Sequence, residues 1–324
     1  MVELSCAFPP GLRTPDHIAL AEGLGFARAW CYDTPALFCD VWATLCRAAD
    51  RTQRIGLGPA VLVPSLRPLM TNAAGAATLA ALAPGRTALG IGTGSTGRST
   101  LGKRPMRWAE VASYTVALRA LLRGEDVEWE GRLLRMLHDD GYAAARPIDL
   151  PILIGAEGPT GLAVAHEVGD GVLSVTGPKP GFDWCAVLQF GTVLDPGEAC
   201  DDPRVIRAVG HAVTGAYAGF YELSPDGVAH LPGGAEWRSV VDAVPERERH
   251  LALHEGHMVR VLDRDRALVT PVMVAAATFT GTAEELAQRL NALADAGATE
   301  VIVQPGGDDI ERELLTLARV AEIA

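Results

Sequence analysis

The stretch ALGIGTGSTGRSTLGKRP, residues 88–105, decides between two folds for this chain. Its glycines at 92, 94 and 97 have the Gly-x-Gly-x-x-Gly spacing that opens the helix under a pyrophosphate in dinucleotide-binding domains. In those domains the glycines lead directly into a helix, and an acidic residue follows at the end of the next strand. Here RSTLGKRPMR follows, without a helical apolar period and with a glycine and a proline inside it. We therefore interpret the stretch as the carboxyl end of a buried strand, where glycines let a ligand approach the backbone.

Outward from this stretch, the chain alternates between apolar strands and amphipathic helices. We predict strands at residues 2–8, 27–33, 54–63, 86–92, 151–158, 170–177, 204–213 and 300–305. Helices are expected at 14–24, 39–49, 68–83, 108–123, 159–168, 283–296 and 308–322. Eight strand–helix units joined by right-handed crossovers predict a (β/α)8 barrel, an α/β fold, as one domain over residues 1–324. A hairpin at about 125–150 and a helical segment at about 215–275, expected over the barrel mouth, are read as insertions.

Composition excludes several classes of protein. The 324 residues are 48% apolar and carry a formal net charge of −12, which disfavours nucleic-acid binding. No apolar run approaches the ~18 residues that cross a membrane. The beginning, MVELSCAFPPGLRTPD, lacks the basic region of a signal peptide, and the six cysteines show no metal-binding spacing. We expect a cytoplasmic protein with reduced cysteines that acts on a small molecule.

Four stretches carry a family resemblance. They are RIGLGPAVLVPSLRPLMTNAAGAATLAALAPGRTALGIGTG (54–94), STLGKRPMRWAEVASYTVALRALLRGEDVEWEG (99–131), PILIGAEGPTGLAVAHEVGDGVL (151–173) and TGTAEELAQRLNALADAGATEVIV (280–303). The chain resembles the bacterial-luciferase-like superfamily and, within it, the deazaflavin branch that includes methylenetetrahydromethanopterin reductase.

The resemblance implies a TIM barrel that transfers a hydride between coenzyme F(420), an 8-hydroxy-5-deazaflavin, and a small organic substrate at the barrel mouth. It also implies a homodimer. Two alternatives stay open, because one fold hosts several functions. One is an FMN-dependent two-component monooxygenase, and the other is a barrel that binds a flavin without turnover.

The resemblance places the cofactor at the carboxyl ends of the strands. It matches Asp33 to an aspartate that hydrogen-bonds the deazaflavin, and the Ala60–Val61 bond to a non-prolyl cis peptide behind one face of the ring. It matches Thr93 and Gly94 to the ribityl-phosphate side, and the helix start in GAEGPTGL offers amides to a phosphate. The alternatives are a capping aspartate, an ordinary strand and plain turns. The expected cofactor-binding residues are Asp33, Ala60, Val61, Thr93, Gly94, Arg98, Glu157, Gly158, Thr160 and Gly161.

Two departures from the family concern proton transfer. The branch's glucose-6-phosphate dehydrogenase has a histidine where this chain has Thr34, and a glutamate where it has Ser95. These differences put sugar-phosphate oxidation in doubt. The candidate catalytic residues are Asp33 and His257, the latter in HEGHMV, where the alternative is ordinary helix packing. Zinc is not indicated, because HEGH lacks the HExxH spacing.

Two further sets of residues are expected around the cofactor. The substrate walls are Phe8, Thr34 and Trp184. A basic cluster of Lys103, Arg104 and Arg107 follows the glycine stretch and could attract the polyglutamate tail of the deazaflavin. A solvated basic loop is the alternative.

Overall fold

The structure is a computed structural model that describes residues 2–324, and it divides into two compact units. The first comprises the residues up to 98, together with 104–188 and 293–302; the second comprises 99–103, 189–292 and 303–324. None of the helices in residues 2–324 combines the length and the apolar character needed to cross a bilayer.

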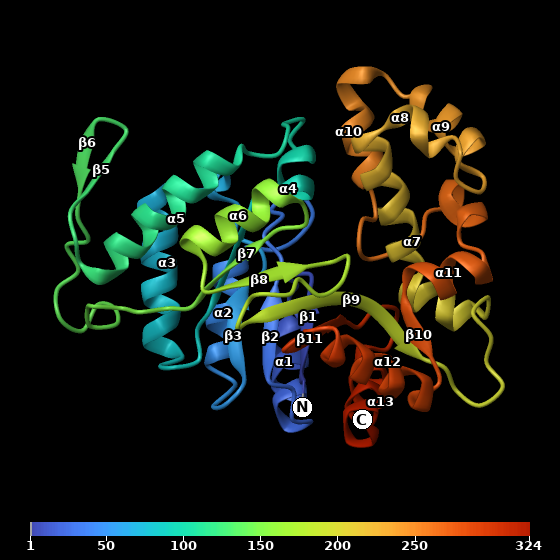
Figure 1. Ribbon diagram of the computed structural model, residues 1–324, viewed down its shortest axis with the longest axis horizontal. Coiled ribbons are helices and arrows are strands. Elements are labelled where there is room, and N and C mark those ends of the chain that lie inside the picture. The colour runs from blue at the N-terminus through green and yellow to red at the C-terminus, as the bar shows by residue number, and fades with distance from the viewer. Residues whose placement is uncertain (1) are drawn as a thin grey trace. The chain divides into compact units, whose positions relative to one another are not determined.

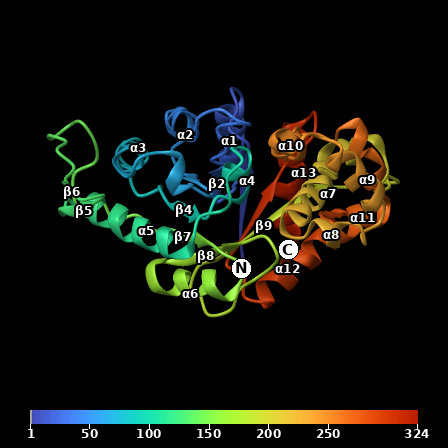
Figure 2. The same ribbon diagram turned by 90° about the horizontal axis from the view of Figure 1, so that it is seen from above.

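Eight parallel strands form a nearly closed barrel (Figures 1 and 2). Six of them belong wholly to the first unit, and the last residues of the other two, β9 and β11, are assigned to the second. The ring runs in the order β3-β2-β1-β11-β9-β8-β7-β4, and bridges from Leu57 to Thr87 and from Leu62 to Ile91 bring β4 back beside β3. Strands covered on both faces are expected to be apolar throughout, and all four residues of β4 are buried. The predicted barrel is confirmed. Its strands are β1 (Glu3–Phe8), β2 (Arg28–Cys31), β3 (Gly56–Pro59), β4 (Leu89–Gly92), β7 (Ile152–Gly155), β8 (Gly171–Ser174), β9 (Cys185–Val193) and β11 (Glu300–Gln304).

Helices surround these strands in the first unit (Figure 2). Asp40 begins α2 by accepting a hydrogen bond from the amide of Ala43 at 3.0 Å, and α5 ends at Gly124 in the left-handed conformation. Glu130 and Gly131, both with positive φ, form the tight turn of the predicted hairpin. The elements are α1 (Thr14–Gly23), α2 (Val41–Ala49), the 3-10 turn η1 (Pro64–Leu66), α3 (Leu69–Leu82), α4 (Ser95–Ser99), α5 (Trp108–Arg123), β5 (Val127–Trp129), β6 (Arg132–Leu134) and α6 (Pro159–Val168).

One predicted strand is wrong. Residues 204–213 belong to helix α7 (Pro203–Leu223), and the strand that completes the ring is β9, which the sequence reading missed. The buried residues of this segment are Val205, Ala208, Val209, Ala212 and Val213, together with two between them, and the apolar ones recur every three or four positions. That is a helical period, although a short apolar segment of this kind is also compatible with a buried strand.

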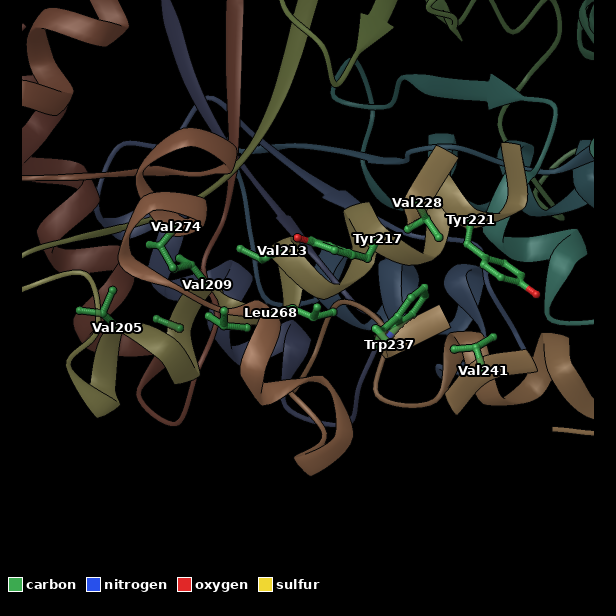
Figure 3. Packing of buried hydrophobic residues seen from close by; sticks show 12 residues of the cluster. Val205, Val209, Val213, Tyr217, Tyr221, Val228, Trp237, Val241, Leu268 and Val274 are labelled. Carbon is green, nitrogen blue, oxygen red and sulfur yellow. The ribbon is translucent and has the colours of Figure 1, made fainter. Parts of the chain in front are cut away.

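The second unit is mainly helical and has its own apolar core. Tyr217 of α7 packs edge-on against Trp237 at 6.0 Å between ring centroids (Figure 3). The Trp237 indole nitrogen also donates to Asp265 at 2.7 Å. The predicted segment 215–275 lies inside this unit. Besides α7 and most of α12 (Ala283–Asp295), its elements are α8 (Pro225–Val228), α9 (Gly234–Asp242), α10 (Glu246–His254), η2 (Asp263–Leu268), α11 (Pro271–Ala277), β10 (Phe279–Gly281) and α13 (Ile310–Ile323).

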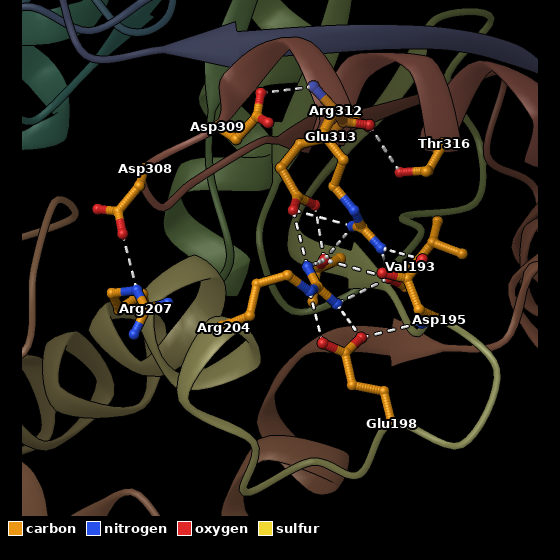
Figure 4. A network of polar contacts seen from close by, with 11 residues as sticks. Val193, Asp195, Glu198, Arg204, Arg207, Asp308, Asp309, Arg312, Glu313 and Thr316 are labelled. Atoms are coloured by element: carbon orange, nitrogen blue, oxygen red, sulfur yellow. Dashed lines mark hydrogen bonds and ion pairs between the residues drawn. The ribbon is translucent and has the colours of Figure 1, made fainter.

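A buried ion network ties three elements of the second unit together (Figure 4). Glu313 of α13 is paired with Arg204 of α7 and with Arg312, each at 2.9 Å. The hydroxyl of Thr192 on β9 donates to the same carboxylate at 2.6 Å. Because Glu313 is buried, these three donors offset the cost of removing its charge from water.

Candidate functional site

Most of the predicted cofactor-binding residues follow the ends of parallel strands, and therefore lie on one rim of the barrel. Asp33 follows β2, Ala60 follows β3, Thr93 follows β4 and Glu157 follows β7. The register pairs Gly92 with Gly155, so the segments after β4 and β7 are neighbours on this rim. The structure thus brings together residues from four separate stretches of sequence.

The glycines of the opening stretch make room for the segment after β3. A Cβ at Gly92 would lie 2.8 Å from a methyl of Val61, and one at Gly94 would lie 2.3 Å from a methyl of Val63. The peptide bond between Ala60 and Val61 is cis, as the resemblance predicted. The Gly-x-Gly spacing is therefore explained by close backbone packing, and only the five-residue helix α4 follows it.

Asp33 is held by an arginine that the sequence reading did not identify. The Arg67 guanidinium donates to both oxygens of Asp33 at 2.7 Å, and its other terminal nitrogen donates to Asp40 at 2.7 Å. The amide of Val63 also donates to Asp33, at 3.3 Å. Burial raises the pKa of Asp33 above its ordinary value, while Arg67 and this amide oppose the rise. Asp33 is thus anchored beside the segment that contains the cis peptide.

Glu157 organises the loop that follows β8. Its carboxylate accepts hydrogen bonds from the Ser174 hydroxyl at 2.9 Å, from the amide of Val175 at 2.5 Å and from the Thr176 hydroxyl, and it pairs with Lys179 at 3.1 Å. Burial alone would raise the pKa of Glu157, but these donors outweigh burial and hold the pKa below its ordinary value. We interpret Glu157 as the residue that holds Lys179 at the rim.

A side chain would have room at Gly158, the N-cap of α6, but not at Gly161, three residues later. Gly158 caps the helix without a side chain, and a Cβ built there would meet no atom within 4 Å. The amides of Thr160 and Gly161 precede the first intrahelical bond, from Leu162 to Gly158, so the helix itself offers them no acceptor. A Cβ at Gly161, by contrast, would lie 2.4 Å from the Trp108 ring. Gly161 is therefore required for packing between α6 and α5.

The loop after β4 is fixed by backbone contacts. The Thr93 carbonyl accepts from the amide of Met106 at 2.9 Å. Arg98 donates to the carbonyl of Arg104 at 2.5 Å and to the Ser65 hydroxyl, so its predicted cofactor role competes with an anchoring role.

The predicted basic cluster is exposed, but one of its three residues, Arg107, is in an ion pair. Arg107 is paired with Glu110 at 2.8 Å, which cancels its charge locally. Lys103 and Arg104 are exposed, and they are the positive charges of the cluster left for a distant anion.

Trp184 is not on the predicted rim. It immediately precedes β9, so it lies at the amino end of the barrel, where its indole nitrogen donates to Glu300, the first residue of β11, at 2.7 Å. The error followed from missing β9.

Phe8 ends β1 on the correct rim but is buried, with its ring 6.2 Å from that of His17. Thr34 is buried at the turn after Asp33, where its carbonyl accepts from the amides of Leu37 and Phe38. The substrate roles of Phe8 and Thr34 stay predictions.

His257 lies in the second unit, beside a second histidine. Its ring centroid is 5.1 Å from that of His254, and the His254 ring contacts Glu222 at 3.0 Å. Burial, reinforced by the neighbouring histidines, lowers the pKa of His257 to about 3. A neutral imidazole can form hydrogen bonds at pH 7, but it cannot supply a proton as a cationic acid.

Sequence reasoning missed Arg67 and Lys179, and a signal existed for one of them. The chain has only two lysines, Lys103 and Lys179, and each follows the carboxyl end of a barrel strand. Because lysine is so rare in this chain, its presence after two strand ends could have marked both lysines as candidates for the site. Arg67 gave no comparable signal, because its partner Asp33 is 34 residues away in sequence.

Comparison with known proteins identifies the family of this chain. Residues 10–184, more than half of the chain, match the family model described as luciferase-like monooxygenase. The chain belongs to this family.

Relatives of this luciferase-like chain include deazaflavin enzymes. It is 27% identical to the 5,10-methylenetetrahydromethanopterin reductase of Methanolobus tindarius over 329 residues, covering 96% of this chain and 95% of that protein. It is 37% identical over 137 residues to the F(420)-dependent glucose-6-phosphate dehydrogenase of Nakamurella multipartita, covering 40% of each. The structure of the coenzyme F(420)-dependent tetrahydromethanopterin reductase of Methanopyrus kandleri superposes with a TM-score of 0.68 at 21% identity, covering 100% of this chain and 99% of the other.

Proposed function

We propose that this chain is an oxidoreductase that transfers a hydride between coenzyme F(420) and a small organic substrate at the carboxyl rim of the barrel. The observation that carries the proposal is the open amino terminus of α6 at Gly158, on the same rim as Asp33 and the Ala60–Val61 peptide. The names of the relatives support a deazaflavin rather than another phosphorylated ligand.

The residues present fit the phosphate of such a cofactor. A helix amino terminus offers backbone donors and a partial positive charge. The amides of Thr160 and Gly161 supply those donors, and a Cβ at Gly158 would meet no atom within 4 Å. Lys179, held by Glu157, adds a full positive charge on the adjoining loop. Thr93 and Gly94 lie after the neighbouring strand and would flank the same group.

The ring would lie against the backbone at Ala60 and Val61, with Asp33 at its edge. The cofactor, when bound, supplies the hydride acceptor or donor. The protein's contribution is to hold the ring in one orientation and to exclude water from it. Asp33 suits the orienting role because Arg67 fixes its carboxylate. We assign His257 a neutral hydrogen-bonding role, in line with its lowered pKa.

Two extensions complete the proposal. The exposed Lys103 and Arg104 would attract the polyglutamate tail. We also propose that the active form is a homodimer.

An FMN-dependent monooxygenase is the second candidate, because the family description itself names monooxygenases. FMN also carries a phosphate, so the α6 terminus alone does not separate the two cofactors. A barrel that binds a flavin without turnover is the third candidate.

Titration of the purified protein with coenzyme F(420) and with FMN, followed by cofactor fluorescence, separates these candidates. We expect F(420) to bind and FMN to bind at least tenfold more weakly. A Gly158→Val variant should weaken F(420) binding about tenfold, or about 1.4 kcal/mol. The same variant should bind a deazaflavin without the phosphate as the wild type does. Tight FMN binding without F(420) binding would favour the monooxygenase, and binding of neither would refute the proposal.

A further inference from the structure

A cavity of about 350 Å³ opens at the amino end of the barrel, opposite the rim that carries the candidate site. Its walls come from the first residue of β2, the end of α3, and the segments that precede β4, β7 and β9. Parallel strands begin at one common end, so these segments are neighbours although they are far apart in sequence. All of the lining residues belong to the first unit. The cavity is at the lower end of the range for small-molecule sites, which is about 300–1,000 Å³.

Arg28, the first residue of β2, is held in a fixed position at this cavity. Its guanidinium lies over the Trp184 ring, with the central carbon 4.5 Å from the ring centroid. Trp184 is itself fixed, because its indole nitrogen donates to Glu300 at 2.7 Å. A Cβ at Gly56 of β3 would lie 2.5 Å from the Arg28 Nη1, so glycine is needed there to make room for the arginine. Arg28 is therefore a preorganised group of hydrogen-bond donors.

The residues around Arg28 do not satisfy all of its donors. The Nε atom is buried and has no hydrogen-bond partner within residues 2–324. Two carboxylates balance the charge, Glu3 at 3.6 Å and Glu300 at 3.7 Å, but both are too far away for a hydrogen bond. The Glu300 oxygens accept instead from the indole nitrogens of Trp30 and Trp184, and neither glutamate lines the cavity. A buried donor without an acceptor is costly, so the cavity favours a ligand that supplies one.

A second arginine adds positive charge to the cavity. Arg86 donates to the Thr52 hydroxyl at 3.2 Å and to the Ile55 carbonyl at 2.8 Å, and these neutral acceptors do not cancel its charge. Burial lowers the pKa of Arg86 below its ordinary value, because the charge is partly removed from water. The negative residue in this lining, Asp149, pairs with Arg123 at 3.3 Å. The cavity therefore favours an anion over a neutral or cationic ligand.

The other walls of the cavity are mainly apolar. Alanine, proline, isoleucine and leucine side chains form most of them, among them Ala80, Ala145, Ile148, Leu150 and Pro151. Apolar walls with a small number of polar groups are typical of sites that bind and orient a small organic molecule. A guanidinium matches the two oxygens of a carboxylate, because it can donate two parallel hydrogen bonds to them.

We propose that this cavity binds a small organic carboxylate, with its carboxylate on the Arg28 guanidinium and its apolar body against the alanine and proline walls. The charge of Arg86 stabilises the same anion. Catalytic residues of (β/α)8 barrels lie at the carboxyl end of the strands, so we interpret the ligand as an effector rather than a substrate. The inference goes beyond the proposed function, and it does not depend on which cofactor is bound.

Fluorine NMR of the full chain, with 4-fluorobenzoate as the probe, tests the site through broadening of the probe's line. We expect a dissociation constant of about 1 mM, as suits a ligand with few heavy atoms. The neutral 4-fluorobenzamide has the same shape and should bind at least about tenfold more weakly, because it lacks the charge. Inorganic phosphate lacks the apolar body and should displace the probe only at about tenfold higher concentration than benzoate does.

Two variants disturb the cavity by different means. Arg28→Lys keeps the charge but removes the planar fork, and Ala145→Phe places a ring at an exposed position of the wall. Each should weaken binding of 4-fluorobenzoate about tenfold. The matched controls are Arg319→Lys and Ala321→Phe, which make the same changes at exposed residues outside the lining. Both controls should bind the probe as the wild type does.

Circular dichroism checks that each variant is folded, and Ala145→Phe decides the matter where Arg28→Lys unfolds. The inference is overturned if the wild type does not bind the probe, or if the amide or phosphate competes as well as benzoate. It is also overturned if the folded variants bind the probe normally, or if coenzyme F(420) displaces it, since the probe would then lie at the opposite rim. Failure of the hydride-transfer proposal appears in the cofactor titrations, which do not use this probe.

Discussion

The Arg67 guanidinium donates to both carboxylate oxygens of Asp33 at 2.7 Å, although the two residues are on different loops of the barrel rim. The side chain of Asp33 is 1% exposed and that of Arg67 is 12% exposed. A pair this buried is costly to break from one side, because Arg67 would lose both of its bonds to Asp33, keep its pair with Asp40 and gain little contact with water.

Replacing Asp33 should therefore destabilise the protein as well as alter cofactor binding. We expect Asp33→Ala to lower the free energy of unfolding by about 3 kcal/mol. Asp40→Asn is the control, since Asp40 is half exposed and asparagine preserves the cap of α2; its loss should be below about 1 kcal/mol. Urea unfolding at pH 7 measures both. Equal losses would contradict the view that Asp33 is the principal partner of Arg67.

The two glycines at the start of α6 should respond differently to a methyl group. Gly161→Ala places a Cβ 2.4 Å from the Trp108 ring, so we expect a loss of about 1–3 kcal/mol in stability. Gly158→Ala meets no atom within 4 Å, but alanine is a poorer N-cap than glycine, so the loss should stay below about 1 kcal/mol. Thermal and urea unfolding of the two variants provide the comparison. A stable Gly161→Ala variant would show that α5 and α6 can separate at this point.

The affinity for long-tailed deazaflavin should depend on salt. Contacts between an exposed basic loop and a polyglutamate tail fade over a Debye length of ~10 Å at 0.1 M salt. Neutralising Lys103 and Arg104 together, as Lys103→Gln with Arg104→Gln, should remove most of this salt dependence. Arg107 is left unchanged, because Glu110 already pairs with it.

The control for this salt effect is Arg54→Gln, an exposed arginine just before β3 and so at the amino end of the barrel. It should bind as the wild type does at every salt concentration. A tail-less deazaflavin should also bind the double variant normally. If Arg54→Gln has the same effect as the double variant, net charge rather than the loop explains the salt dependence.

Stability should fall as the solution is acidified below pH 6.5. Burial lowers the pKa of His211 to about 4, whereas in the unfolded chain it returns to its ordinary value near 6.5. Between these values the unfolded state binds a proton that the folded state does not. The free energy of unfolding therefore decreases with falling pH, by up to about 1.4 kcal/mol per pH unit for this residue.

Urea unfolding of wild type and His211→Leu between pH 7 and 4.5 isolates that contribution. The variant should show a shallower decrease, whatever its stability at pH 7. His166→Leu, which replaces an exposed histidine by the same residue, measures how far the substitution itself changes the slope. Parallel curves for wild type and His211→Leu would mean that His211 titrates alike in both states.

The sequence by itself determined the barrel and most of its helices. A helix with one buried face has apolar residues at every third or fourth position, and this spacing is visible in the sequence without knowledge of the fold. The capping box at Thr282 and Glu285 is an example: the Thr282 amide donates to the Glu285 carboxylate at 2.9 Å, and the Glu285 amide donates to the Thr282 hydroxyl at 3.3 Å. The ends of the strands could be located from the positions at which the apolar segments stop. Since parallel strands end on a common rim, the residues expected to bind a cofactor could be named before the structure was known.

Only the tertiary structure decided what these residues contact. Asp33 has Arg67 as its partner, Gly161 faces Trp108, and the glycines of GIGTG pack against the segment around Val61. It also decided that β9, and not residues 204–213, completes the ring, which moved Trp184 to the opposite end of the barrel. A local pattern records which face of an element is buried. The identity of the neighbour on that face is set by chain segments far away in sequence, and it exists only once the barrel has closed.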